Sequence, residues 1–113
     1  MTGWQMAARS GAVFLGAGLL EIAGGYGVWL WLRDGRTVAF ALGGAALLVG
    51  FGLVMTLLPA HFGRAYAAYG GVFIVLSLLW GWRVDGRAPD RWDTLGALIV
   101  LAGVAVILLM PRR

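Results

Sequence analysis

Four long runs of apolar residues dominate this sequence. They occupy residues 11–32, 38–58, 65–82 and 94–110. A helix needs about 17–25 apolar residues to cross the hydrocarbon core of a bilayer, so each run is long enough, the last with Asp93 as its predicted N-cap. Pro59 and Pro111 follow the second and fourth runs and are expected to close those helices. The pattern predicts an all-α membrane protein, with four transmembrane helices in a single domain over residues 1–113.

Composition points to lipid as the solvent. Hydrophobic residues make up 61% of the chain and charged residues 12%, against about 45–50% and about 25% in a soluble domain. Connections between the runs are short, so neighbouring helices should form antiparallel hairpins. A cleaved signal peptide is the alternative for the first run, but that run continues past Gly25 to Leu32 and contains a carboxylate.

The chemistry-bearing residue types are scarce. The chain has no cysteine and one histidine, His61, so we expect no disulfide, no metal site and no cofactor. Its net charge of +4 comes from nine arginines scattered between apolar runs. That distribution suits anionic lipid head groups better than nucleic acid. No nucleophile–base pair or phosphate-binding loop is present, so an enzyme is not expected.

Orientation in the membrane is set by arginines near the ends of the helices. One face carries four of them, Arg9, Arg64, Arg112 and Arg113. The other carries five, Arg33, Arg36, Arg83, Arg87 and Arg91. This even balance predicts insertion in both orientations and hence an antiparallel homodimer, although uneven spacing of the arginines or cellular factors can still select one orientation.

Glu21 is the one ionisable side chain other than tyrosine within the four runs, and it lies near the middle of the first. A charge at this depth costs roughly 2.5–3.5 kcal/mol on insertion scales. No arginine or lysine within the runs can pair with it, so either the carboxyl is protonated or a cation binds it from outside. A carboxyl that exchanges a proton for a cation is the core of a proton-coupled exporter. A neutral glutamic acid bonded to a neighbouring helix is the structural alternative.

Small residues lie one turn to either side of Glu21. They are Ala17 and Gly18 before it, and Gly24 and Gly25 after it. They leave volume beside the carboxylate for a ligand, or they allow close helix packing.

The third run carries an aromatic stripe at helical spacing, Tyr66, Tyr69, Phe73 and Trp80. Tyr66, Tyr69 and Phe73 are candidates for holding an organic cation by cation–π attraction, although such stripes also serve ordinary packing. Gly70 and Gly71 interrupt the stripe and are the predicted helix hinge. In the fourth run Gly96 and Gly103 share one face, which predicts a helix–helix contact of the dimer; a plain lipid-facing helix is the alternative.

Four segments together resemble the YnfA family of small bacterial membrane proteins. They are residues 21–24, 29–32, 63–72 and 89–93, and the resemblance extends over roughly residues 11 to 111. That family is in turn similar to the small multidrug resistance (SMR) transporters. The resemblance implies that Glu21 binds protons and cationic substrate in competition, and that Tyr66 corresponds to the tyrosine of the third helix in those transporters.

The SMR pattern extends to other positions, with two departures. Gly71 and Val72 match the start of its kink motif, and Gly96, Gly103 and Val104 match its dimerisation pattern in the fourth helix. Tyr69 stands where those exporters commonly have tryptophan, and Phe73 replaces the second kink glycine.

The expected function is proton-coupled export of small or hydrophobic cations by an SMR-like antiparallel homodimer, a multi-pass protein of the bacterial inner membrane. Its expected partners are the lipid bilayer, a second copy of the chain, protons and the cationic substrate. Two alternatives stay open: a dual-topology ion channel, which needs a polar-lined path, and an accessory membrane subunit that does not itself transport.

Overall fold

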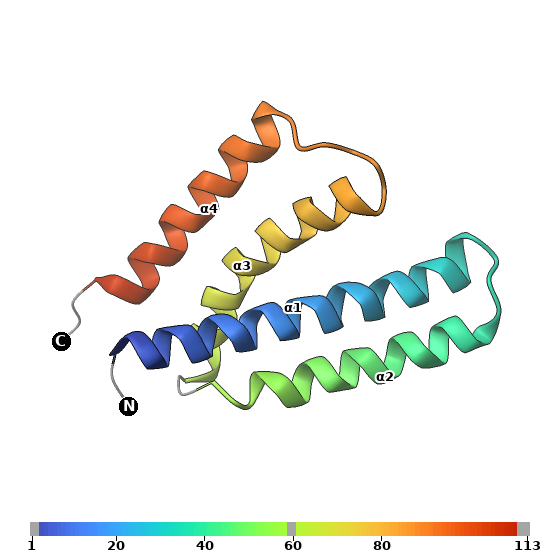
Figure 1. Ribbon diagram of the computed structural model, residues 1–113, viewed down its shortest axis with the longest axis horizontal. Helices are drawn as coiled ribbons and strands as arrows, with labels where there is room; N and C mark the ends of the chain where they lie inside the picture. Colours follow the sequence, from blue (N-terminus) through green and yellow to red (C-terminus); the bar gives the residue numbers. More distant parts are fainter. Residues whose placement is uncertain (1–2, 59–60, 111–113) are drawn as a thin grey trace. The chain divides into compact units, whose positions relative to one another are not determined.

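The computed structural model describes residues 3–58 and 61–110. These residues form four helices and no strand: α1 (Gly3–Arg33), α2 (Val38–Met55), α3 (Phe62–Arg83) and α4 (Arg91–Leu109) (Figure 1). Each helix is long and apolar enough to cross a membrane. The predicted all-α fold with four transmembrane helices is therefore confirmed. Pro59 and Pro111 lie outside the described residues.

The helix ends differ from the predicted ones, and local hydrogen bonds explain the end of α2. α1 begins earlier, at Gly3, and α2 ends at Met55. After Met55, the N–H groups of Leu57 and Leu58 donate three residues back, to the carbonyl oxygens of Val54 and Met55 over 3.0 and 3.3 Å. Such short-range bonds tighten the end of a helix and use carbonyl groups that would otherwise have no partner.

Asp90, and not Asp93, is the N-cap of α4. The Oδ1 atom of Asp90 accepts from the backbone N–H groups of Trp92 and Asp93 over 2.9 and 2.8 Å. In return, Oδ2 of Asp93 accepts from the N–H of Asp90 over 3.1 Å. This reciprocal capping box satisfies donors that a helix start leaves free. The predicted N-cap was wrong because the charged segment before Thr94 is itself the first turn of the helix.

The chain divides into two helical hairpins, α1–α2 and α3–α4. Both hairpins begin their turn with the same three residues, Asp-Gly-Arg, at 34–36 and at 85–87. The glycine has a positive φ in each, +69° in the first and +72° in the second. In each turn, the N–H groups of the aspartate and the arginine both donate to one carbonyl oxygen of the preceding helix, over 3.1–3.2 Å. Because L side chains rarely adopt this φ, glycine suits both turns.

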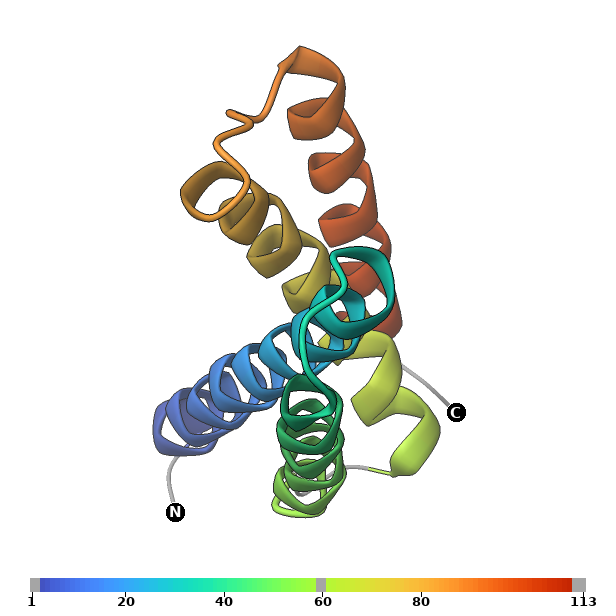
Figure 2. The same cartoon turned by 90° about the vertical axis from the view of Figure 1, so that its right-hand side faces the viewer.

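Three glycines hold the first hairpin together. A Cβ added to Gly24 would lie 2.7 Å from the carbonyl oxygen of Gly44, and one added to Gly27 would lie 2.8 Å from that of Phe40. The helices therefore contact backbone to backbone. They lie close together near their turn and separate toward the opposite end (Figure 2). Close approach of this kind suits helices in lipid, where association depends on van der Waals packing rather than on removal of water.

One glycine has the corresponding role in the second hairpin. A Cβ added to Gly71 of α3 would lie 2.5 Å from Cγ2 and 3.3 Å from Cβ of Val104 in α4. Leu101 lies beside it, with Cδ2 at 3.6 Å from the same point. Val104 therefore packs inward on its own hairpin.

Large apolar side chains lie on the outside of the molecule, and no described residue of α4 is buried. In water such exposure would be unfavourable, whereas lipid tails are as apolar as these side chains. Four helices of this length and apolarity make the chain a multi-pass membrane protein.

Candidate functional site

Glu21 lies in α1, well away from both ends of the helix, and its side chain is half-buried. Among the described helices the other charged residues, Arg9, Arg64 and those at the helix ends, lie nearer a terminus of their helix. Among the ionisable acidic and basic side chains of the described residues, the Glu21 carboxyl is therefore the closest to the middle of a helix.

The small residues around Glu21 do not share one role. Ala17 and Gly18 are buried. The backbone of α2 occupies the space beside Gly24, so this glycine allows close helix packing and leaves no volume for a ligand. An added Cβ on Gly25 meets nothing within 4 Å. Any room for a ligand beside the carboxyl within this hairpin lies on the Gly25 side.

The aromatic stripe of α3 is a continuous row of ring contacts. Ring centroids are 6.4 Å apart between Tyr66 and Tyr69, and 5.6 Å apart between Tyr69 and Phe73. Phe62 extends the row by one turn, with its centroid 4.5 Å from that of Tyr66. Sequence reasoning missed Phe62 because the predicted span began at residue 65, although Phe62 precedes Tyr66 by four residues, which is the spacing of helix neighbours.

The row changes from exposed to buried along its length. Phe62 and Tyr66 are exposed, Tyr69 is buried and Phe73 is half-buried. These faces can hold an organic cation by cation–π attraction, or they can stabilise α3 by ring packing alone. Glu21 belongs to the first hairpin and the aromatic row to the second, so their sharing of one site stays a prediction.

The proposed hinge glycines differ from each other. α3 is helical from Phe62 through Gly70 and Gly71 to Arg83. Gly70 has open space where a Cβ would be, whereas Gly71 packs against Val104. Gly71 thus has a packing role that the sequence did not reveal, and the hinge stays a prediction.

The predicted dimer glycines lie on an open face of α4. Cβ atoms added to Gly96 and Gly103 meet nothing within 4 Å, and both residues are exposed. Val104, which the SMR pattern groups with them, is directed at α3 instead. The contact between copies of the chain through Gly96 and Gly103 stays a prediction.

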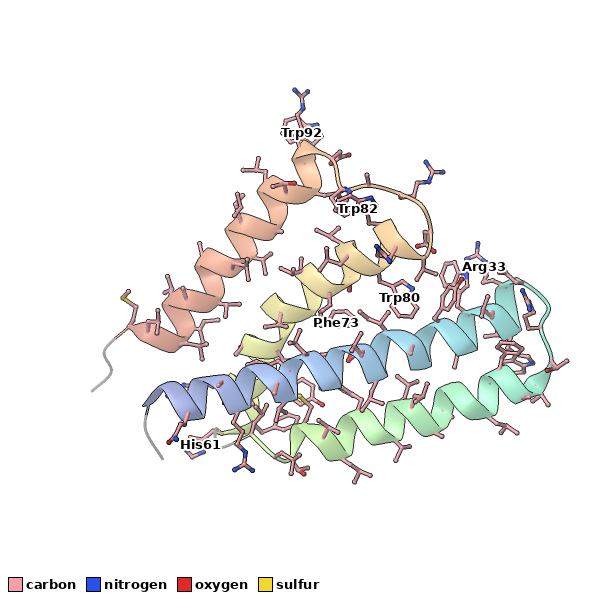
Figure 3. The ribbon with its side chains drawn as sticks, in the orientation of Figure 1. Arg33, His61, Phe73, Trp80, Trp82 and Trp92 are labelled. Atoms are coloured by element: carbon pink, nitrogen blue, oxygen red, sulfur yellow. The ribbon has the colours of Figure 1, made fainter. Side chains whose placement is uncertain are left out.

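Arginine and aromatic side chains pair near the helix ends. The guanidinium carbon of Arg33 lies 4.5 Å from the centroid of the Trp29 ring, and that of Arg91 lies 4.9 Å from the Trp92 ring. Figure 3 shows Trp82 at the end of α3 and Trp92 at the start of α4, on either side of their turn. Tryptophans at this level are typical anchors at the boundary between lipid and water. The described residues contain no group of three or more histidine, cysteine, aspartate or glutamate side chains that could hold a metal ion.

Residues 7–113 match the family described as "Uncharacterised BCR, YnfA/UPF0060 family". A UPF0060 membrane protein of Synechocystis is 57% identical over 107 residues, which cover 95% of this chain and 99% of the relative. The UPF0060 membrane protein YfjF of Bacillus subtilis is 55% identical over 101 residues, which cover 88% of this chain and 93% of the relative. No solved structure matches the chain. With family and relatives matching over nearly its whole length, this chain belongs to the YnfA/UPF0060 family of membrane proteins.

Proposed function

We propose that this protein is an SMR-like exporter of the bacterial inner membrane, in which an antiparallel homodimer exchanges protons for a small or hydrophobic cation. One observation carries the proposal: Glu21 is half-buried and stands far from both ends of a helix long enough to cross the bilayer. Ionisable groups at such depth are expensive to insert and usually mark ion or proton pathways. The resemblance to SMR transporters supports the same role.

Competition for one site provides the mechanism. The two Glu21 carboxyls of the dimer would face a shared site and titrate as a coupled pair. A cation binds when the carboxyls are ionised, and proton binding from the other side displaces it. Rearrangement of the two subunits then exposes the site to alternate faces of the membrane.

The aromatic row of α3 supports the choice of a cation as substrate. Tyr66, Tyr69 and Phe73 follow one another with centroids 5.6–6.4 Å apart, which gives an organic cation a series of ring faces. Nothing comparable favours an anion within the spans, because the arginines lie toward the helix ends and in the loops.

The test is cation transport driven by a pH gradient into liposomes that contain the purified protein. Glu21→Gln keeps the shape of the side chain but cannot become anionic, so we expect uptake to fall to the level of empty liposomes. Asp85→Asn is the matched control, since it makes the same chemical change in an exposed turn and should leave uptake unchanged. Uptake by Glu21→Gln at the unmodified rate would overturn the proposal.

The same assay separates the exporter from a channel. An exporter gives saturable flux that depends on the pH gradient, whereas a channel gives flux that does not saturate with the cation.

A further inference from the structure

The first hairpin carries an open apolar groove that the exporter proposal does not use. It has a volume of about 400 Å³ and lies between α1 and α2. Its walls include Ala23, Tyr26 and Leu30 from α1, and Phe40, Gly43 and Leu47 from α2. Tyrosine is the one residue type with a polar side-chain group among those that line it.

The groove lies on a different face of α1 from Glu21. At 3.6 residues per turn, Tyr26 and Leu30 lie about 140° and about 180° around the helix from Glu21. The close contact of α1 with α2 through Gly24 and Gly44 separates the two faces. A ligand in the groove would therefore not reach the carboxyl.

The length of the groove is close to the thickness of one leaflet of the bilayer. It begins beside the turn at residues 34–36 and extends along α2 from residue 39 to Leu47. At 1.5 Å per residue this is about 12 Å, compared with about 15 Å for half of the hydrocarbon core. The groove thus covers most of the depth of one leaflet, from the interface toward the midplane.

The enclosed cross-section of the groove is smaller than that of a helix. A volume of about 400 Å³ over about 12 Å gives a mean cross-section of about 33 Å². A helix about 10 Å across has a cross-section of about 80 Å². The enclosed part of the groove therefore matches a single hydrocarbon chain better than a whole helix of a second copy.

The Arg36 side chain lies at the end of the groove nearest the turn. The guanidinium carbon of Arg36 lies 5.6 Å from the centroid of Phe40, which is one of the groove walls. Arg33, the last residue of α1, lies next to this turn, with its guanidinium carbon 4.5 Å from the centroid of the Trp29 ring. Asp34 stands between the two arginines, so residues 33–36 carry a net positive charge. This positive charge at the end of the groove attracts an anionic head group and repels a cationic amphiphile.

From this combination we infer that the groove binds one acyl chain of an anionic phospholipid, whose phosphate contacts Arg36. The apolar walls bind the chain, and the guanidinium hydrogen-bonds to phosphate oxygens. Its positive charge favours a head group with net negative charge over a zwitterionic one. The site would hold one such lipid per protomer in the leaflet that faces the 34–36 turn.

The test uses native mass spectrometry of the full-length protein in detergent, titrated with phosphatidylglycerol or with phosphatidylcholine of the same chains. We expect one phosphatidylglycerol per protomer to bind about tenfold more tightly than phosphatidylcholine. Gly43→Leu should abolish this site, because Gly43 lines the groove and an added Cβ there meets nothing within 4 Å. Arg36→Gln should keep chain binding but reduce the preference between the two lipids to near unity.

Gly52→Leu is the matched control. Gly52 lies on the same helix, also with open space around an added Cβ, and about 180° around the helix from Gly43. It should bind phosphatidylglycerol like the unmodified protein. The inference is overturned if Gly43→Leu binds phosphatidylglycerol as before, or if Arg36→Gln keeps the full preference. It is also overturned if Gly43→Leu dissociates the dimer without changing lipid binding, since the groove would then be a protein interface.

Discussion

At the residue scale, two glycines adjacent in the sequence can differ in environment, one packed against the neighbouring helix and the other open. Gly24 meets the backbone of α2, whereas Gly25 faces open space. Both lie one turn from Glu21, so the carboxyl has a packed flank and an open one. A cation that binds Glu21 would be expected to approach from the open flank, because no displacement of α2 is needed there.

The first prediction concerns the length of the side chain at position 21. Glu21→Asp keeps the charge but withdraws it by one methylene, so we expect substrate binding to persist with an altered pH profile. In the proposed mechanism proton and cation compete for the same oxygens, so cation affinity should rise with pH in the unmodified protein, and binding should release protons. Proton release measured in weakly buffered detergent solution checks both points. Affinity that is independent of pH would argue against competition at Glu21.

At the element scale, each hairpin depends on a close approach at glycine. The first has three such positions, Gly24, Gly27 and Gly44, and the second has Gly71 against Val104. An Ala at these positions gains helix propensity of about 1 kcal/mol over Gly, but it must displace what occupies its Cβ position. At Gly71 that neighbour is a β-branched side chain with little rotamer freedom.

We therefore predict that Gly71→Ala destabilises the α3–α4 hairpin by about 1–3 kcal/mol, the usual effect of overpacking. Gly70→Ala is the control, because its Cβ meets open space, and it should be neutral or slightly stabilising. Val104→Ala combined with Gly71→Ala should recover part of the loss, since contacting residues couple in a double-mutant cycle. The free energy of unfolding in mixed micelles is measured for five proteins: the unmodified one, Gly70→Ala, Gly71→Ala, Val104→Ala and the double variant. Equal effects of Gly70→Ala and Gly71→Ala would show that this contact does not limit stability.

For the whole molecule, the arginine balance of four against five predicts that both orientations coexist in the membrane. C-terminal reporters that are active only in the cytoplasm, or only outside it, should therefore both give signal. Adding two or three lysines at the C-terminus should bias the population toward one orientation. A single active reporter in the unmodified protein would contradict dual topology.

The dimer prediction rests on the open face of α4. Gly103→Leu should shift the protein toward monomer, because a large side chain prevents close approach of a second helix. Ala105→Leu is the control: Ala105 is exposed on the same helix but lies about 160° around it from Gly103. Crosslinking in detergent reports the fraction of dimer. If Gly103→Leu crosslinks as efficiently as Ala105→Leu, the interface lies elsewhere.

The sequence by itself determined the four apolar helices and the position of Glu21 away from the ends of the first. Both are local properties, because a helix in lipid must satisfy its own backbone groups and needs only sufficient apolar length. The aromatic row was also predictable, since Tyr66, Tyr69 and Phe73 follow the period of a helix. The start of α4 was not, because either Asp90 or Asp93 can cap a helix, and the reciprocal hydrogen bonds between them decide which one does.

Only the tertiary structure decided which glycines pack and which stay open. Gly24 and Gly25, like Gly70 and Gly71, are indistinguishable in sequence, and their environments differ because one faces the neighbouring helix and the other does not. The groove beside Phe40 follows from the same geometry, since it runs alongside the close contact between α1 and α2. Such features depend on the relative rotation of two helices, which arises from all their contacts together and is not encoded at any one position.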